Sequence, residues 1–154
     1  MLVENWYLVL GILVIMISKK VFIAPDIFIA FIDRAKEKHE QAAAFFRFFA
    51  ENEYQIYTDI LSVNAVYTHI YTNISPSLSK DFLRTIALSN LNIIYSDEND
   101  SKVALKTLVM YQANELTFSK ALIAVLANRR NIPQICTNEY LPTLFGLQIF
   151  YLPI

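Results

Sequence analysis

Glycine and cysteine are scarce in this chain of 154 residues. The two glycines, Gly11 and Gly146, lie far apart, which excludes a glycine-rich phosphate-binding loop. Cys136 is the single cysteine, so neither an internal disulfide nor a cysteine-based zinc site can form. A reducing compartment fits this composition best, and we expect a cytoplasmic domain.

The chain also lacks a strong charge of either sign, since its formal net charge is −1. No overall positive field attracts nucleic acid, so an RNA contact would need a local basic patch. Arg129 and Arg130 form one candidate phosphate-binding pair. The alternative is that they end a helix, where cations suit the negative end of the helix dipole.

Hydrophobic residues make up 55% of the chain, above the usual 45–50%, and much of the excess lies in residues 1–19. Residues 6–17 are uncharged, with aromatic side chains at their start and Lys19 and Lys20 after their end, as in membrane segments. The run is shorter than the roughly 17 to 20 residues that span a bilayer. Three interpretations stay open: a membrane anchor through residues 6–18, a helix packed on the domain or a partner, and sequence upstream of the native start.

Residues 20–154 show the alternation of a single α/β domain. Residues 20–24 indicate a short buried strand that stops at Pro25. Asp26 follows the proline and precedes an apolar run, which is typical of a helix N-cap. The later segments predict further strands at 54–58, 91–95, 134–137 and 148–152, and helices at 26–34, 36–50, 59–71, 76–89, 97–112 and 117–130. This order predicts a three-layer α/β/α fold with a mainly parallel sheet.

Several local strings, in order, resemble the PIN domain, the nuclease fold of the VapC-type toxins. The family's hydrophobic strand, acidic turn and Ile-Phe-Ile start are similar to residues 22–29. Its second-helix opening resembles residues 38–42, and its last third resembles residues 121–124 and 132–139. The resemblance covers residues 20–154 and implies a prokaryotic toxin–antitoxin lineage of endoribonucleases that use Mg²⁺ or Mn²⁺ held by carboxylates.

The acidic positions of that family are mostly lost here. By the resemblance, the first aspartate falls on Ala24, the glutamate of the third helix on Asn64, and the aspartate of the buried helix on Lys120. The last aspartate falls on Glu139, so one acid in four is kept and it has changed type. The resemblance therefore implies a degenerate active site.

Two hypotheses follow for the site. In the first, Asp26, Asp59 and Glu139 rebuild a catalytic carboxylate site, with Asn64 as an amide ligand and Asp26 and Glu139 on the metal. The alternative for Asp26 and Asp59 is that each of them only caps a helix. In the second, the Lys120 ammonium takes the place of the metal and occludes the site, unless Lys120 is simply a solvated residue at a helix start.

The sequence thus leaves open whether the protein is an enzyme. One class is a PIN-like module with weak or lost nuclease activity that binds RNA or a protein. The other is an active Mg²⁺- or Mn²⁺-dependent ribonuclease, toxin-like or RNA-processing. The expected partners are single-stranded RNA, an antitoxin or other protein, and a second copy of the chain, with the membrane as an alternative through the N-terminal segment.

Overall fold

The computed structural model describes residues 18–111, 115–139, 141–142 and 144–152. Eleven elements follow one another in this part of the chain. They are β1 (Lys20–Ile23), α2 (Pro25–Ile32), α3 (His39–Glu51), β2 (Gln55–Asp59), α4 (Ile60–Asn73), α5 (Pro76–Leu88), β3 (Asn92–Ile94), α6 (Glu98–Met110), α7 (Phe118–Arg129), β4 (Gln134–Cys136) and β5 (Gln148–Ile149). The predicted order of helices and strands is confirmed.

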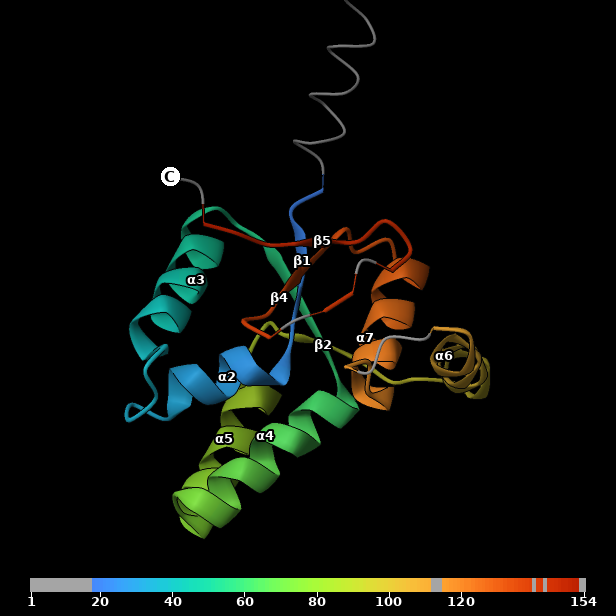
Figure 1. The fold of residues 1–154 in the computed structure, drawn as a ribbon. Coiled ribbons are helices and arrows are strands. Elements are labelled where there is room, and N and C mark those ends of the chain that lie inside the picture. The colour runs from blue at the N-terminus through green and yellow to red at the C-terminus, as the bar shows by residue number, and fades with distance from the viewer. Residues whose placement is uncertain (1–17, 112–114, 140, 143, 153–154) are drawn as a thin grey trace, which may run out of the picture.

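The strands form one sheet in the order β3-β2-β1-β4-β5, and every pair in it is parallel. Helices α2 to α5 lie to one side of the sheet and α6 and α7 to the other (Figure 1). The predicted three-layer fold is therefore correct. Because β1 is central and its neighbours β2 and β4 run parallel to it, their carboxyl ends meet at one edge of the sheet.

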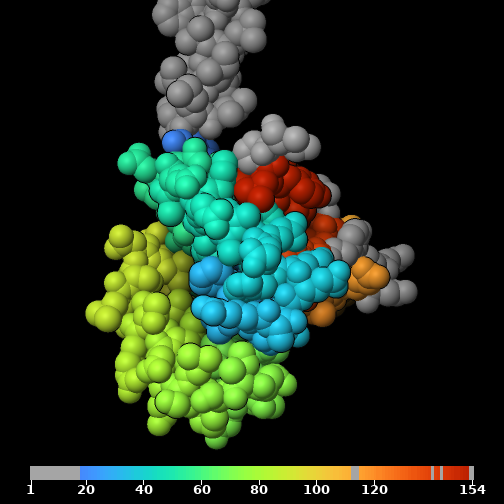
Figure 2. Space-filling view, turned by 90° about the vertical axis from the view of Figure 1, so that its left-hand side faces the viewer, coloured from blue at the N-terminus to red at the C-terminus, as the bar shows by residue number. Residues whose placement is uncertain are grey.

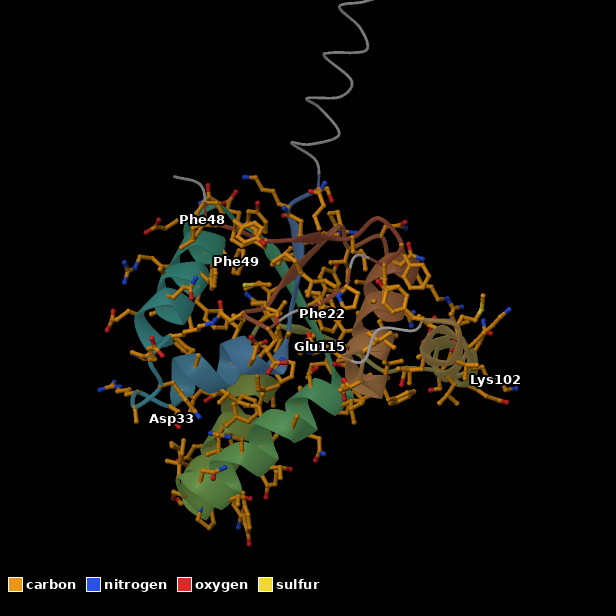
Figure 3. The ribbon with its side chains drawn as sticks, viewed as in Figure 1. Phe22, Asp33, Phe48, Phe49, Lys102 and Glu115 are labelled. Carbon is orange, nitrogen blue, oxygen red and sulfur yellow. The ribbon has the colours of Figure 1, made fainter. Side chains whose placement is uncertain are left out.

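The opening strand is buried on both faces. Val21 and Ile23 belong to the core under α2, α3 and α4, whereas Phe22 belongs to the core under α7. This split follows from the two-residue period of a strand. The aromatic side of α3, which carries Phe48 and Phe49 (Figure 3), fills the first core. There the ring centroid of Phe49 lies 4.7 Å from that of Phe150.

Helix α7 fills the second core. Residues 121–127 are all buried, as the uninterrupted apolar run predicts. The helix begins after Thr117, whose side chain accepts a hydrogen bond from the backbone of Lys120. It carries Lys120 in its first turn and Arg129 at its end, so it positions two of the predicted site residues.

Four helices begin at a side-chain cap, and the bounds of some elements differ from the prediction. Asp59, Ser75, Asp97 and Thr117 each cap a helix with a side-chain acceptor. Strand β5 is shorter than predicted, and the helix predicted to reach residue 112 ends at Met110, with Tyr111 as its C-cap. Residues 6–17, for which a membrane anchor is one of the three interpretations, lie outside the described residues. Within the part of the chain that the structure describes, no helix has the length and apolar character needed to cross a bilayer.

Candidate functional site

A small pocket of about 180 Å³ lies at the carboxyl ends of β1 and β4. Ala24 and Asp26 reach it from the β1–α2 turn, and Lys120 reaches it from the first turn of α7. Thr137 and Glu139 reach it from the segment after β4. The fold thus brings three of the predicted site residues, Asp26, Lys120 and Glu139, to one pocket, which we call the polar pocket.

Asp26 is not the N-cap of α2, and that prediction is wrong. Ala24 holds the N-cap position and offers no side-chain acceptor, while its own N–H donates to the Cys136 carbonyl at 3.0 Å. Pro25 opens the helix, so Asp26 is its second residue and its side chain crosses to the end of β4. There it accepts from the Thr137 hydroxyl at 3.0 Å and from the Asn138 N–H at 2.6 Å.

The Asp26 carboxylate is electrostatically disfavoured in this position. Burial raises the pKa of Asp26 above its ordinary value, and the nearby charge of Glu139 raises it further. The hydrogen bonds from Asn138 and Thr137 act in the opposite direction without reversing the shift. Asp26 and Glu139 both line this pocket.

Lys120 places an ammonium in the same pocket. Its Nζ lies 3.4 Å from Oε2 of Glu139, and its side chain is only 21% exposed, compared with 60% for Glu139. Glu139 is itself anchored, because its backbone N–H donates to the Thr137 hydroxyl at 3.1 Å. Lys120 is therefore not merely a solvated residue at a helix start, as one interpretation of the sequence suggested.

Asp59 and Asn64 lie in a neighbouring hollow of about 100 Å³ that shares only Pro25 and Ser119 with the polar pocket. The Asp59 carboxylate accepts from the Ser62 N–H at 3.2 Å, so the N-cap prediction is confirmed for this residue. Burial raises the pKa of Asp59, and the hydrogen bonds from Ser62 oppose the rise. The four residues of the rebuilt site are thus divided between two adjoining hollows.

The donor set fits a divalent cation poorly. Magnesium and manganese need several oxygen ligands, and Asp26 and Glu139 are the two acidic residues among the described residues that line this pocket. An ammonium stands beside the second carboxylate. Among the described residues, no three acidic, histidine or cysteine side chains gather closely enough to hold a metal.

Arg129 and Arg130 do not point freely from a helix end. Both guanidinium groups donate to the Asp100 carboxylate, which is fully buried, and Arg130 does so with two nitrogens at 3.1 Å each. Burial alone would raise the pKa of Asp100, but the hydrogen bond and charge of Arg130, with help from Arg129, hold it below the ordinary value. Sequence reasoning missed Asp100, although its place three residues after Asp97 is typical of a capping box.

A second cavity, of about 340 Å³, lies on the α2–α5 side of the sheet and was also missed. We call it the apolar groove. In Figure 2 the blue surface of α2 lies between the teal surface of α3 and the yellow-green surface of α5. Most of its walls are aromatic and aliphatic, from α2 (Phe28, Phe31, Ile32), α3 (Phe46), the start of β2 (Tyr54, Ile56), α5 (Phe82, Thr85, Ile86) and Leu91. The sequence patterns predict that these segments have apolar faces. They do not predict that a cavity remains open between those faces.

The parallel sheet, its order and the pocket at the carboxyl ends of β1 and β4 define a PIN-like fold. Solved structures of PIN-domain toxin proteins share it. VapC20 of Mycobacterium tuberculosis, described as a sarcin–ricin loop cleaving toxin, has a TM-score of 0.66 at 16% identity over 75% of this chain and 86% of that one. VapBC2 of Rickettsia felis, bound to a DNA fragment from its promoter, has a TM-score of 0.59 at 16% identity over 85% and 97%.

FitAcB of Neisseria gonorrhoeae has a TM-score of 0.64 at 11% identity and covers 85% of this chain and 96% of that one. Neither a family model nor a curated protein matches the sequence. At these identities the similarity establishes the fold, and the function has to be argued from the site.

Proposed function

We propose that this chain is a PIN-like module with weak or lost nuclease activity that acts by binding a protein partner. The proposed weak or lost nuclease activity is supported mainly by the ion pair between Lys120 and Glu139 in the polar pocket. A dication held about 4 Å from an ammonium is repelled by roughly 8 kcal/mol at an effective dielectric near 20, before solvent screening. Ala24 and Asn64 supply no carboxylate to offset this repulsion.

The protein-binding half of the proposal is supported by the apolar groove and by the charges. Contiguous exposed apolar surface commonly marks a contact with another polypeptide. The candidate phosphate-binding arginines are engaged by Asp100, and the net charge is −1, so RNA is the less favoured partner. Two of the solved neighbours are toxin–antitoxin complexes, which makes an antitoxin-like helix the first partner to consider. A homodimer remains a prediction.

An RNA cleavage assay tests the loss of activity. Single-stranded RNA incubated with the full chain and Mg²⁺ or Mn²⁺ should remain intact, because the pocket lacks a ligand set for the ion. The matched control is Asp26→Ala, which removes the buried carboxylate of the pocket. Metal-dependent cleavage by the wild-type chain that disappears in Asp26→Ala would overturn the proposal.

The second candidate function is an active Mg²⁺- or Mn²⁺-dependent ribonuclease with a rebuilt site. The proximity of the Asp26 and Glu139 carboxylates favours it, since paired carboxylates are what such a site starts from. For this function Lys120 would have to leave the pocket when the metal enters. The same cleavage assay separates the two candidates.

A further inference from the structure

Helix α4 carries no aspartate, glutamate, lysine or arginine along its 14 residues. One side packs on the core through Val63, Val66 and Ile70, and the opposite side is open to solvent. Figure 1 shows the helix at the margin of the molecule, beside α5. The open side of a surface helix normally carries charged side chains. An open side without them is typical of the centre of a protein–protein contact, where charged residues are depleted and tyrosine is enriched.

Five side chains form a stripe along this open side, which we call the α4 seam: Ile60, Asn64, Tyr67, Tyr71 and the C-cap residue Ile74. Successive members are four, three, four and three residues apart. That spacing is the seam of a coiled coil, because it keeps every member on one face of a helix. Ile60, Tyr71 and Ile74 are 40%, 52% and 40% exposed. The rings of Tyr67 and Tyr71 stack on each other, so the middle of the seam is one aromatic surface.

We propose that the α4 seam binds the α4 seam of a second copy of this chain, with the two helices antiparallel. A stripe without charge can face itself without like-charge repulsion, as a two-fold interface requires. In the antiparallel register Asn64 of one copy lies opposite Tyr67 of the other, and Ile60 lies opposite Tyr71. The Asn64 amide and the Tyr67 hydroxyl can each donate and accept, so this polar pair is satisfied in both halves of the interface.

The carboxylates near the start of α4 favour the antiparallel direction. Asp59 caps the helix, and Asp26 and Glu139 line the polar pocket that adjoins the Asp59 hollow. A parallel pair brings the amino ends of the two helices together, and with them both sets of acids. An antiparallel pair places the two sets at opposite ends of the seam. It also sets the positive end of each helix dipole beside the negative end of the other.

The second copy then borders the candidate site. Asn64 belongs to the seam and also lines the hollow of Asp59, so Tyr67 of the second copy lies at the mouth of that hollow. No residue of α4 is among the described residues that line the apolar groove, so the seam and the groove are separate surfaces. The inference therefore goes beyond the proposed binding of a protein partner and does not depend on what binds in the groove.

Sedimentation equilibrium of the full chain tests the dimer. The weight-average mass should rise with protein concentration from that of one chain toward that of two. Tyr71→Lys places an ammonium in the seam and leaves the core intact, since Tyr71 is half exposed. The matched control is Thr72→Lys, which adds the same charge at the next residue, also exposed but outside the seam. We expect the dissociation constant to rise about tenfold or more in Tyr71→Lys, because an unpaired charge is buried, and to stay unchanged in Thr72→Lys.

Engineered disulfides test the direction of the helices. The single native thiol, Cys136, is buried and does not compete. In the antiparallel dimer the two Ile60 positions are about 16 Å apart along the helices, beyond the reach of a disulfide. A mixture of Ile60→Cys and Tyr71→Cys chains should therefore form a covalent dimer on oxidation with copper–phenanthroline. Ile60→Cys alone should form none.

Three results would overturn the proposal. The first is a wild-type chain that stays monomeric at every concentration. The second is an association that Tyr71→Lys leaves unchanged or that Thr72→Lys weakens equally, which would place the contact outside the seam. The third is cross-linking of Ile60→Cys to itself, which would make the helices parallel. None of these results bears on RNA cleavage or on the apolar groove, so failure here is distinguishable from failure of the proposed function.

Discussion

Two hydrogen bonds tie the Asp26 carboxylate to the segment after β4 at the polar pocket. Thr137 donates its hydroxyl to the Asp26 carboxylate and accepts from the backbone N–H of Glu139, so one side chain links Asp26 to the backbone at Glu139. The bond from the Asn138 N–H fixes the second oxygen of Asp26. At the scale of single residues, the acid of the opening turn is thus a structural link between β1 and β4. Burial works against its charge.

Replacing Asp26 by asparagine should change how stability depends on pH. The folded-state pKa of Asp26 is raised, so the native state binds more protons than the unfolded state between the ordinary value of 3.8 and the raised one. The free energy of unfolding therefore falls as pH rises through that window, and it is constant above it. Asp26→Asn lacks this titration. Urea unfolding from about pH 3 to about pH 7 should show wild-type stability declining relative to the variant.

Asp59 titrates in the same direction in both proteins and cancels from this difference. A wild-type advantage that grows with pH would instead mean that the hydrogen bonds from Thr137 and Asn138 outweigh burial. That outcome would contradict the predicted direction.

For Asp100 we expect the opposite dependence of stability on pH, because two arginines hold its pKa below the ordinary value. Its contribution to stability is present above pH 3.8 and is lost as pH falls through the lowered pKa. Truncation in Asp100→Ala leaves Arg129 and Arg130 without their buried partner and should cost about 3 kcal/mol near neutral pH. The matched control is Lys102→Ala, which breaks a solvent-exposed pair with Glu98 and should cost about 0.5 kcal/mol or less. Equal losses in urea unfolding would contradict this assignment.

At the scale of elements, α3 is held by aromatic packing more than by its own polar contacts. Phe49 is fully buried and its ring contacts Phe45, Phe48, Tyr54 and Phe150. The aromatic face of α3 is thus largely occupied by the core. Phe48 contacts the rings of Phe49, Tyr54 and Phe150 but is only partly buried.

Phe49→Ala should therefore destabilise the fold by about 3–5 kcal/mol, because it removes a buried ring and leaves a cavity. Phe48→Ala should cost less, since water or neighbouring side chains can fill a partly open site. Denaturant unfolding of the two variants measures the difference. A larger loss for Phe48→Ala would show that the core under α3 is organised around a different ring.

Local patterns predicted the elements well where the cause was local. The apolar run of α7 indicated a helix buried on most sides, and Asp59 and Thr117 were recognisable caps because their acceptors serve their own helices. The N-cap prediction for Asp26 was wrong because the hydrogen-bond partners of its side chain, Thr137 and Asn138, lie more than one hundred residues away in the chain. The order of elements placed Asp26 and Glu139 at one edge of the sheet, but the direction of a side chain depends on contacts that no spacing encodes.

At the scale of the molecule, the fold brings two carboxylates, Asp26 and Glu139, to one pocket at the carboxyl edge of the sheet. In this pocket Glu139 forms an ion pair with Lys120. The resemblance to the PIN domain places a family carboxylate at residue 120, where this chain has a lysine. Restoring that charge is a direct test of why the pocket fits no metal. Lys120→Asp removes the ammonium and would leave three carboxylates at the pocket, with Asp26 and Glu139 already in place.

We expect Lys120→Asp to gain a Mn²⁺-dependent rise in melting temperature that the wild-type chain lacks. Without metal the variant should be less stable than wild type, because like charges then crowd the pocket. At 100 times the dissociation constant, Mn²⁺ should stabilise it by about 2.7 kcal/mol, which corresponds to roughly 5–10 °C for a chain of this size. Lys120→Gln removes the cation without adding a ligand and should not respond. A response in the wild-type chain, or none in Lys120→Asp, would mean that residue 120 does not decide whether this pocket can hold a divalent ion.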